Sequence, residues 1–167
     1  MERGKNLVLF HQRIKEYTII ILFSVLGGTI LMASGDLISL YLSIELQSFS
    51  LYILSTIATN SENSTSCGLK YFLIGSLASG FILLGISLIY LWGGCLNLES
   101  LYTLTKNQER SSLNFNQAWS AVDMTILKAG VSIIIIGLLI KIGAAPFHHT
   151  VIDVYSGVPL IVTLWLV

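Results

Sequence analysis

Charged side chains are scarce in this chain. Only 11% of its 167 residues are charged, whereas a soluble domain of this size carries about a quarter. The formal net charge at pH 7 is +0, so nothing favours binding to the phosphates of a nucleic acid. The hydrophobic content of 54% and the mean hydropathy of +0.79 instead indicate membrane spans joined by short polar stretches.

Cysteine and the common ligand-binding motifs are scarce as well. Cys67 and Cys95 have no CxxC neighbour and no nearby histidine pair, so we interpret both as free thiols. The sequence contains no Gly-rich phosphate loop, no nucleophile motif and no cluster of metal ligands. We therefore expect no metal site in this chain, and no site for NADH, flavin or an iron–sulfur cluster.

Four apolar segments are long enough to cross a bilayer core of about 30 Å as helices. We predict an all-α bundle of about five transmembrane segments, one of them a broken helix. The predicted spans are 17–34, 37–58, 71–93 and 126–145, followed by a broken-helix continuation at 146–157 and a partial last span at 158–167. Residues 1–16 form a basic tail. We interpret 17–34 as a retained span rather than a signal peptide, because another span follows it directly.

The connections indicate how the spans are arranged. Gly35 and Asp36 leave so short a turn that the first two spans must form an antiparallel hairpin. Residues 60–68 are expected to form a short polar loop, and the long loop 95–123 to contain a short surface helix. The tail carries four basic residues, which places it in the cytoplasm or the mitochondrial matrix. Asp36 and the long loop then face the opposite side.

Glu45 is the one charged residue of the second span. Nine residues from Asp36 at about 1.5 Å each place it about 14 Å deep, near the membrane midplane. A charge there costs roughly 2.5–3.5 kcal/mol, so it needs protein or water around it. Tyr41, Ser48 and Tyr52 share its helical face. A proton relay and a protonated glutamate that only packs against a neighbouring helix both fit this pattern, and the relay is favoured.

Lys141 is the second charged residue expected at depth. Measured from Lys128 or Val131, it lies about 20 or about 15 Å along the fourth span. This depth is similar to that of Glu45, and we expect the two residues in antiparallel neighbouring helices. The alternative is a lysine near a helix end that extends its ammonium to the far interface.

Pro146 bears on this choice. It cannot donate a hydrogen bond to the carbonyl four residues before it, so the helix should break close to Lys141. Broken helices at membrane depth line cavities or are buried in protein, which favours a hydrated lysine. His148 and His149 follow, and either exchange protons near neutral pH or simply mark the membrane surface.

The third span carries two further features. Lys70 stands at its start and is more readily explained as an interfacial lysine than as a relay group. Ser76 and Gly80 form a pair of small residues four positions apart, which is suited to close helix packing.

Three collinear stretches resemble chain 2 of NADH:ubiquinone oxidoreductase, respiratory complex I. The Glu-bearing helix of that family is similar to GDLISLYLSIELQSFSLYIL at 35–54. The next helix is similar to GLKYFLIGSLASGFILLG at 68–85, and the broken helix to LLIKIGAAPFHHTVIDVYSGVP at 138–159. The resemblance covers nearly all of the chain beyond residue 17.

The resemblance implies a non-redox, antiporter-like subunit in the membrane arm of complex I. Glu45, Lys141, Lys70 and His148 match residues of the family's proton relay. This chain would bind no cofactor, and other subunits would carry FMN, iron–sulfur clusters and ubiquinone. Its partners would be the other membrane-arm subunits and the lipid bilayer. The location would be the mitochondrial inner membrane rather than a bacterial plasma membrane, with the tail on the matrix side.

Members of that family are much longer than this chain. The spans expected before Tyr17 and after Val167 are missing, and the initial Met with its basic tail favours a split subunit, completed by a separate chain, over a truncated one. Two other functions stay open. A subunit of a multisubunit cation/proton antiporter shares the broken-helix motif, although the Glu-bearing helix argues against it. A structural remnant that does not conduct protons is the other.

Overall fold

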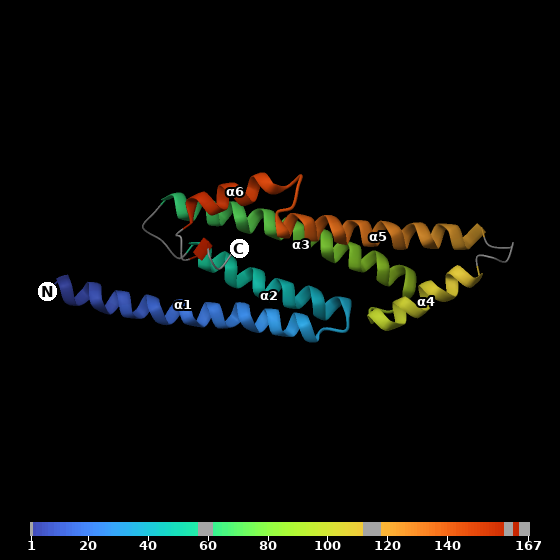
Figure 1. Ribbon diagram of the computed structural model, residues 1–167, viewed down its shortest axis with the longest axis horizontal. Coiled ribbons are helices and arrows are strands. Elements are labelled where there is room, and N and C mark those ends of the chain that lie inside the picture. The colour runs from blue at the N-terminus through green and yellow to red at the C-terminus, as the bar shows by residue number, and fades with distance from the viewer. Residues whose placement is uncertain (1, 57–61, 112–117, 159–161, 164–167) are drawn as a thin grey trace.

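The computed structural model describes the backbone of residues 2–56, 62–111, 118–158 and 162–163, and the side chains of 16–56, 62–106, 125–148, 152–158 and 162–163. The described residues form six helices: α1 (Glu2–Ala33), α2 (Leu37–Thr56), α3 (Glu62–Gly93), α4 (Leu98–Ser111), α5 (Ala118–Ile142) and α6 (His148–Gly157). The predicted all-α bundle is confirmed, with the helices side by side along one axis (Figure 1).

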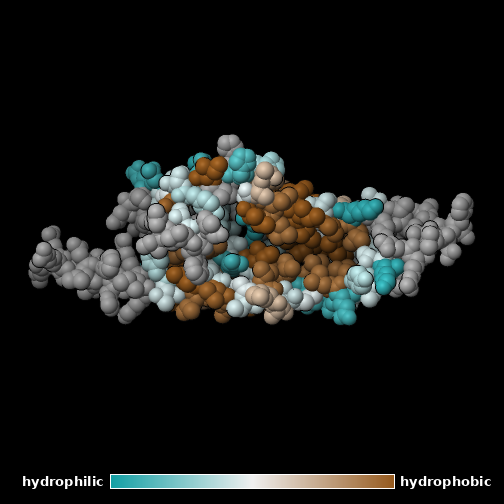
Figure 2. Space-filling model, in the orientation of Figure 1, coloured by the Kyte–Doolittle hydropathy of each residue, from teal (hydrophilic) through white to brown (hydrophobic). Residues whose placement is uncertain are grey.

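Four stretches among the described residues are long and apolar enough to cross a membrane. They are Glu16–Ala33, Leu37–Thr56, Glu62–Gly93 and Thr125–Ile142. Many of their large apolar side chains lie on the outside, and Figure 2 shows them as a broad hydrophobic band with hydrophilic residues near its right-hand end. Such a surface is stable against lipid or further helices rather than water.

The hairpin of α1 and α2 is present as predicted. A turn of three residues, 34–36, separates the two helices. Gly27 of α1 lets them approach closely, because a Cβ added there would lie 2.9 Å from the amide nitrogen of Gln47 and 3.1 Å from the carbonyl oxygen of Ser43. Small residues permit this kind of close packing in membrane helices.

The long helix α3 contacts α2, α5 and α6 and so joins the bundle together (Figure 1). Its interface with α5 is the largest and is lined by glycines. A Cβ on Gly85 would lie 2.7 Å from the carbonyl oxygen of Gly130, and one on Gly137 would lie 2.8 Å from that of Ala78. Ser76 and Gly80, the pair that the sequence suggested for close packing, are exposed and take no part in this interface.

Three helices start earlier than the predicted spans. α1 begins at Glu2, so residues 2–16 of the predicted basic tail are helical. α3 begins at Glu62, so residues 62–68 of the predicted polar loop are helical. Ser64 accounts for part of this, because its hydroxyl donates to the carbonyl of Ser55 on α2 at 2.9 Å and ties the first turn of α3 to its neighbour. α5 begins at Ala118, inside the predicted loop 95–123, and α4 is the surface helix expected in that loop. The predicted partial span 158–167 lies mostly outside the described residues.

The turn before α2 and the turn before α4 lie at the same end of the molecule. An isolated antiparallel bridge joins Asp36 to Asn97, with backbone hydrogen bonds of 3.0 and 3.1 Å on either side of it. The side chain of Asn97 also accepts a hydrogen bond from the amide of Glu99 at 2.9 Å, which caps the first turn of α4.

The predicted break after the fourth span is present, but it begins before Pro146. Gly143 adopts a positive φ of 68°, and its amide donates to the carbonyl of Ile140 at 3.1 Å. The next amide, of Ala144, donates to the carbonyl of Leu139 at 3.0 Å. This pair of bonds is a Schellman cap, which requires a residue that tolerates the left-handed conformation. Gly143 therefore ends α5, and Pro146 prevents the helix from resuming at once.

Candidate functional site

Glu45 and Lys141 form an ion pair inside the bundle. Glu45 is the ninth of the 20 residues of α2, and Lys141 is the last residue but one of α5. The Nζ atom of Lys141 lies 2.5 Å from Oε1 of Glu45. The side chain of Lys141 is 10% exposed and that of Glu45 is 13% exposed. The structure thus brings together the two residues that the sequence placed at similar depth.

The helices that carry this pair run in the same direction. α3 is antiparallel to α2, with Tyr52 against Gly75, and antiparallel to α5, with Ile82 against Gly137. Because α2 and α5 are both antiparallel to α3, they are parallel to each other (Figure 1). The expectation of antiparallel neighbours is therefore wrong. The similar depth follows from helices that enter from one side.

The end of α5 favours a cation at Lys141. The last turn of a helix exposes carbonyl oxygens and carries the negative end of the helix dipole. Lys141 lies two residues before Gly143, whose conformation fixes where that turn stops. The end of α5 thus lies where the Lys141 side chain can contact Glu45.

Ser48 is a second partner of the ammonium group. It lies one turn after Glu45 on α2, is 9% exposed, and its Oγ accepts a hydrogen bond from Nζ of Lys141 at 3.1 Å. The hydroxyl itself donates to the carbonyl of Ile44 at 2.7 Å. The sequence indicated only that Ser48 shares the face of Glu45. Its three-residue spacing from Glu45 was the signal that could have marked it as a partner.

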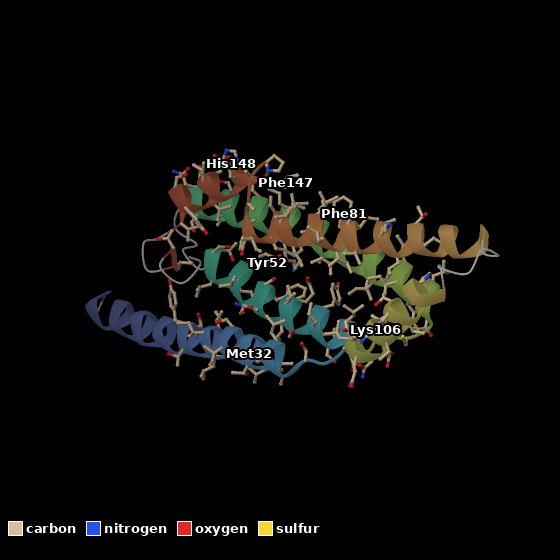
Figure 3. The ribbon with its side chains drawn as sticks, turned by 45° about the vertical axis from the view of Figure 1, so that its right-hand side comes forward. Met32, Tyr52, Phe81, Lys106, Phe147 and His148 are labelled. Atoms are coloured by element: carbon tan, nitrogen blue, oxygen red, sulfur yellow. The ribbon has the colours of Figure 1, made fainter. Side chains whose placement is uncertain are left out.

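Tyr52 continues the same face of α2 and is 7% exposed. Its ring packs edge-on against Tyr71 and Phe72, with centroids 4.9 and 5.6 Å apart. Figure 3 shows it in the space between α2 and the layer of α3 and α5. Its hydroxyl lies against Gly75, where the absence of a side chain leaves room for it. Tyr52 therefore closes the site on the side toward the start of α3.

Lys70 and His148 do not join this pair. Nζ of Lys70 lies 3.5 Å from Oδ2 of Asp153 on α6, and both side chains are more than half exposed. His148 is exposed at the start of α6, next to Phe147 and across α3 from α1 (Figure 3). The side chain of His149 lies outside the described residues. No pattern in the sequence indicates that Asp153 pairs with Lys70, since 82 residues lie between them.

A carboxylate and an ammonium in contact can share a proton. The pair is stable as two charges, and it becomes two neutral groups when the proton passes from lysine to glutamate. A nearby charge shifts the balance between these forms, because the low dielectric of the surroundings screens it poorly. Among the described side chains, no group of three or more His, Cys, Asp or Glu is placed to hold a metal ion.

Known proteins resemble this chain over most of its length. Residues 34–167 match the family described as NADH:quinone oxidoreductase/Mrp antiporter, TM. NADH-ubiquinone oxidoreductase chain 2 of Rhizopus oryzae is 51% identical over 151 residues, which cover 90% of this chain and 26% of that protein.

Two solved structures resemble the fold. A chain of respiratory complex I from Thermus thermophilus with bound aureothin has a TM-score of 0.70 and 27% identity, covering 90% of this chain and 30% of its own length. A chain of the archaeal membrane-bound sulfane sulfur reductase has a TM-score of 0.74 and 26% identity, covering 91% and 28%. This chain thus spans between a quarter and a third of the length of the proteins it resembles.

Proposed function

Because the chain belongs to the NADH:quinone oxidoreductase/Mrp antiporter family of transmembrane proteins, we propose that it carries part of a proton path in the membrane arm of complex I. In this proposal Glu45 and Lys141 are the central proton carriers. Quinone reduction elsewhere in the complex changes the charges around them and so drives the proton across the membrane. The likeness to a chain 2 supports complex I over other members of the family.

The ion pair of Glu45 and Lys141 is the observation that carries the proposal. Each charge alone would be costly at this depth, and a purely apolar contact would pack the same helices without that cost. The two groups come from different helices, one of them broken next to its lysine, and they meet with side chains that are nearly buried. Such intramembrane charges mark ion and proton pathways.

Lys70 and His148 enter the proposal as relay groups farther along the path. Both lie on the side of α3 that packs against α6, apart from the central pair. Lys70 is already engaged with Asp153, so a proton moving there passes through a second acid–base pair. An imidazole at His148 is suited to proton exchange near neutral pH.

The proposed setting follows from the same family. The chain would lie in the mitochondrial inner membrane among other membrane-arm subunits, and the remaining helices of the fold would cover its apolar surface. FMN, iron–sulfur clusters and ubiquinone would be bound by other subunits. The N-terminal end of α1, with the basic tail, would face the matrix.

Substitution of the pair tests the proposal in the assembled complex. We expect Glu45→Gln and Lys141→Met to abolish most proton uptake driven by NADH oxidation in sealed membrane vesicles. Lys128→Gln is the matched control, because Lys128 is an exposed lysine of the same helix and should leave pumping unchanged. Pumping that persists in both pair variants would contradict the proposal and leave a structural role.

A multisubunit cation/proton antiporter is the alternative, since the description of the matched family includes such antiporters. Purification of the chain from its native membrane separates the two. Co-purification with flavin and iron–sulfur subunits supports complex I. Recovery with cation/proton antiporter subunits alone supports the alternative.

A further inference from the structure

Lys141 has two acceptors on one helix, and only one of them carries a charge. Glu45 and Ser48 lie three residues apart on α2, so both side chains face α5 at successive turns. Nζ of Lys141 lies 2.5 Å from Oε1 of Glu45 and 3.1 Å from Oγ of Ser48. The ammonium is therefore held between a carboxylate and a hydroxyl.

The hydroxyl of Ser48 is fixed as an acceptor. A serine hydroxyl has one proton to donate, and Ser48 gives it to the carbonyl of Ile44 at 2.7 Å. The lone pairs of its oxygen are left for Lys141 and for the hydroxyl of Tyr52, which is also hydrogen-bonded to Ser48. Ser50 provides a comparison on the same helix: it is 4% exposed and donates to the carbonyls of Gln47 and Leu46, but makes no hydrogen bond to Lys141.

We propose that Ser48 is a positioning residue that keeps the Lys141 ammonium beside Glu45 whether Glu45 is charged or neutral. When the carboxylate takes up a proton, it no longer attracts the ammonium as an anion. The bond to Ser48 does not depend on that charge, so it keeps the ammonium within reach of Glu45 while Glu45 holds a proton taken from another group of the path. This role rests on the proposed proton path, because it matters only if Glu45 changes its charge.

The Glu45→Gln variant tests the proposal directly, because glutamine stands in for the neutral acid. The full chain, labelled with ¹⁵N-lysine and ¹³C-serine, is reconstituted in phosphatidylcholine vesicles for solid-state NMR, and Lys141→Arg identifies the Lys141 signal. We expect a dipolar contact between Nζ of Lys141 and Cβ of Ser48 in the wild type and in Glu45→Gln. Loss of that contact in Glu45→Gln overturns the proposal.

Three further variants in the Glu45→Gln background test the hydroxyl itself. Ser48→Ala should broaden or split the single ammonium signal of Lys141, because the hydroxyl that holds the ammonium in place is gone. Ser48→Thr keeps the hydroxyl and should restore the single signal, and Ser50→Ala should leave it unchanged. An unchanged signal in Ser48→Ala, no rescue by threonine, or an equal effect of Ser50→Ala would each overturn the proposal.

These spectra do not measure pumping, so the two proposals fail separately. If the contact persists in Glu45→Gln while NADH-driven pumping by that variant is normal, Ser48 still holds the ammonium but the proton path is wrong. If pumping is lost and the contact is lost too, the path stands and the role of Ser48 is wrong.

Discussion

Glu45 and Lys141 compensate each other's charge, so removing one of them should lower the free energy of unfolding of the chain. Breaking a buried pair by removing one partner costs about 3–5 kcal/mol, because the remaining charge has lost its compensation. We expect Lys141→Met to lower the free energy of unfolding by about that amount. The double variant Glu45→Gln, Lys141→Met should lose clearly less than Lys141→Met alone. Titration of the full chain with SDS in mixed micelles, followed by circular dichroism, measures both, and a double variant less stable than Lys141→Met contradicts the prediction.

Substitution of Gly75 tests whether the Tyr52 hydroxyl needs the space that this glycine leaves. A Cβ at Gly75 would collide with the Tyr52 hydroxyl and lie 2.6 Å from its Cζ, and the ring cannot easily retreat because Tyr71 and Phe72 pack against it. Gly75→Ala should therefore destabilise the chain by about 1–3 kcal/mol. Gly80→Ala is the control on the same helix, because an added Cβ meets nothing within 4 Å. It should be neutral or stabilise α3 by up to about 1 kcal/mol.

The residues of the central pair could be predicted from the sequence, but their full set of contacts could not. A single carboxylate in an otherwise uncharged span must have a partner, and this argument led to Glu45 and Lys141. The hydrogen bond to Ser48 depends on where α5 ends, because Lys141 lies in the last turn of that helix. The contact between Lys70 and Asp153 depends on how α6 folds back along α3. The spacing of Glu45 and Ser48 shows only that they share a helical face, and no local pattern indicates the contact of Lys70 with Asp153.

At the scale of helices, the cap of α5 determines where Lys141 stands. Gly143 has φ 68°, and an L-residue in the left-handed region costs about 1–2 kcal/mol. We expect Gly143→Ala to lower the free energy of unfolding by that amount and to reduce pumping, since the end of α5 must shift to relieve the strain. Gly35→Ala serves as the control because an added Cβ there has open space and φ is not positive. Equal losses of stability and pumping in Gly143→Ala and Gly35→Ala would contradict this role of the cap.

The sequence was enough to predict which segments form helices, but not where each helix begins and ends. The apolar runs are long enough that each must be a helix in a membrane, which made the spans predictable. The first turns of α3 contain Asn, Ser and Thr, which favour loops when considered alone. A contact with α2 stabilises them as helix, through the hydrogen bond of Ser64 to Ser55. The break in α5 was expected from Pro146, yet the glycine three residues earlier is what ends the helix.

At the scale of the whole molecule, the four spans bury little of their own surface. Only 11% of the residues of the first span and 17% of those of the fourth are buried, against 39% in the most apolar 18-residue part of the third, which lies between its neighbours. The outer helices therefore present most of their apolar side chains to the surroundings. In the proposed setting, the remaining helices of the fold would pack on this surface. The pair of Glu45 and Lys141 is nevertheless assembled entirely from residues of this chain.

The bridge between Asp36 and Asn97 makes the sidedness of the bundle testable. It holds the turn before α2 and the start of α4 at one end, while α3 begins at the other. The basic tail should face the matrix, which puts Glu62 on the matrix side and Asp36 on the opposite side. The test uses a chain in which serine replaces Cys67 and Cys95. One cysteine at a time is then introduced at Asp36, Ser100 or Glu62, and a membrane-impermeant maleimide shows which face of the membrane it lies on. We expect labelling of Asp36→Cys and Ser100→Cys from one face of sealed vesicles and of Glu62→Cys from the other. Asp36→Cys and Ser100→Cys labelled from different faces would contradict the fold, whereas all three reversed together would contradict only the orientation.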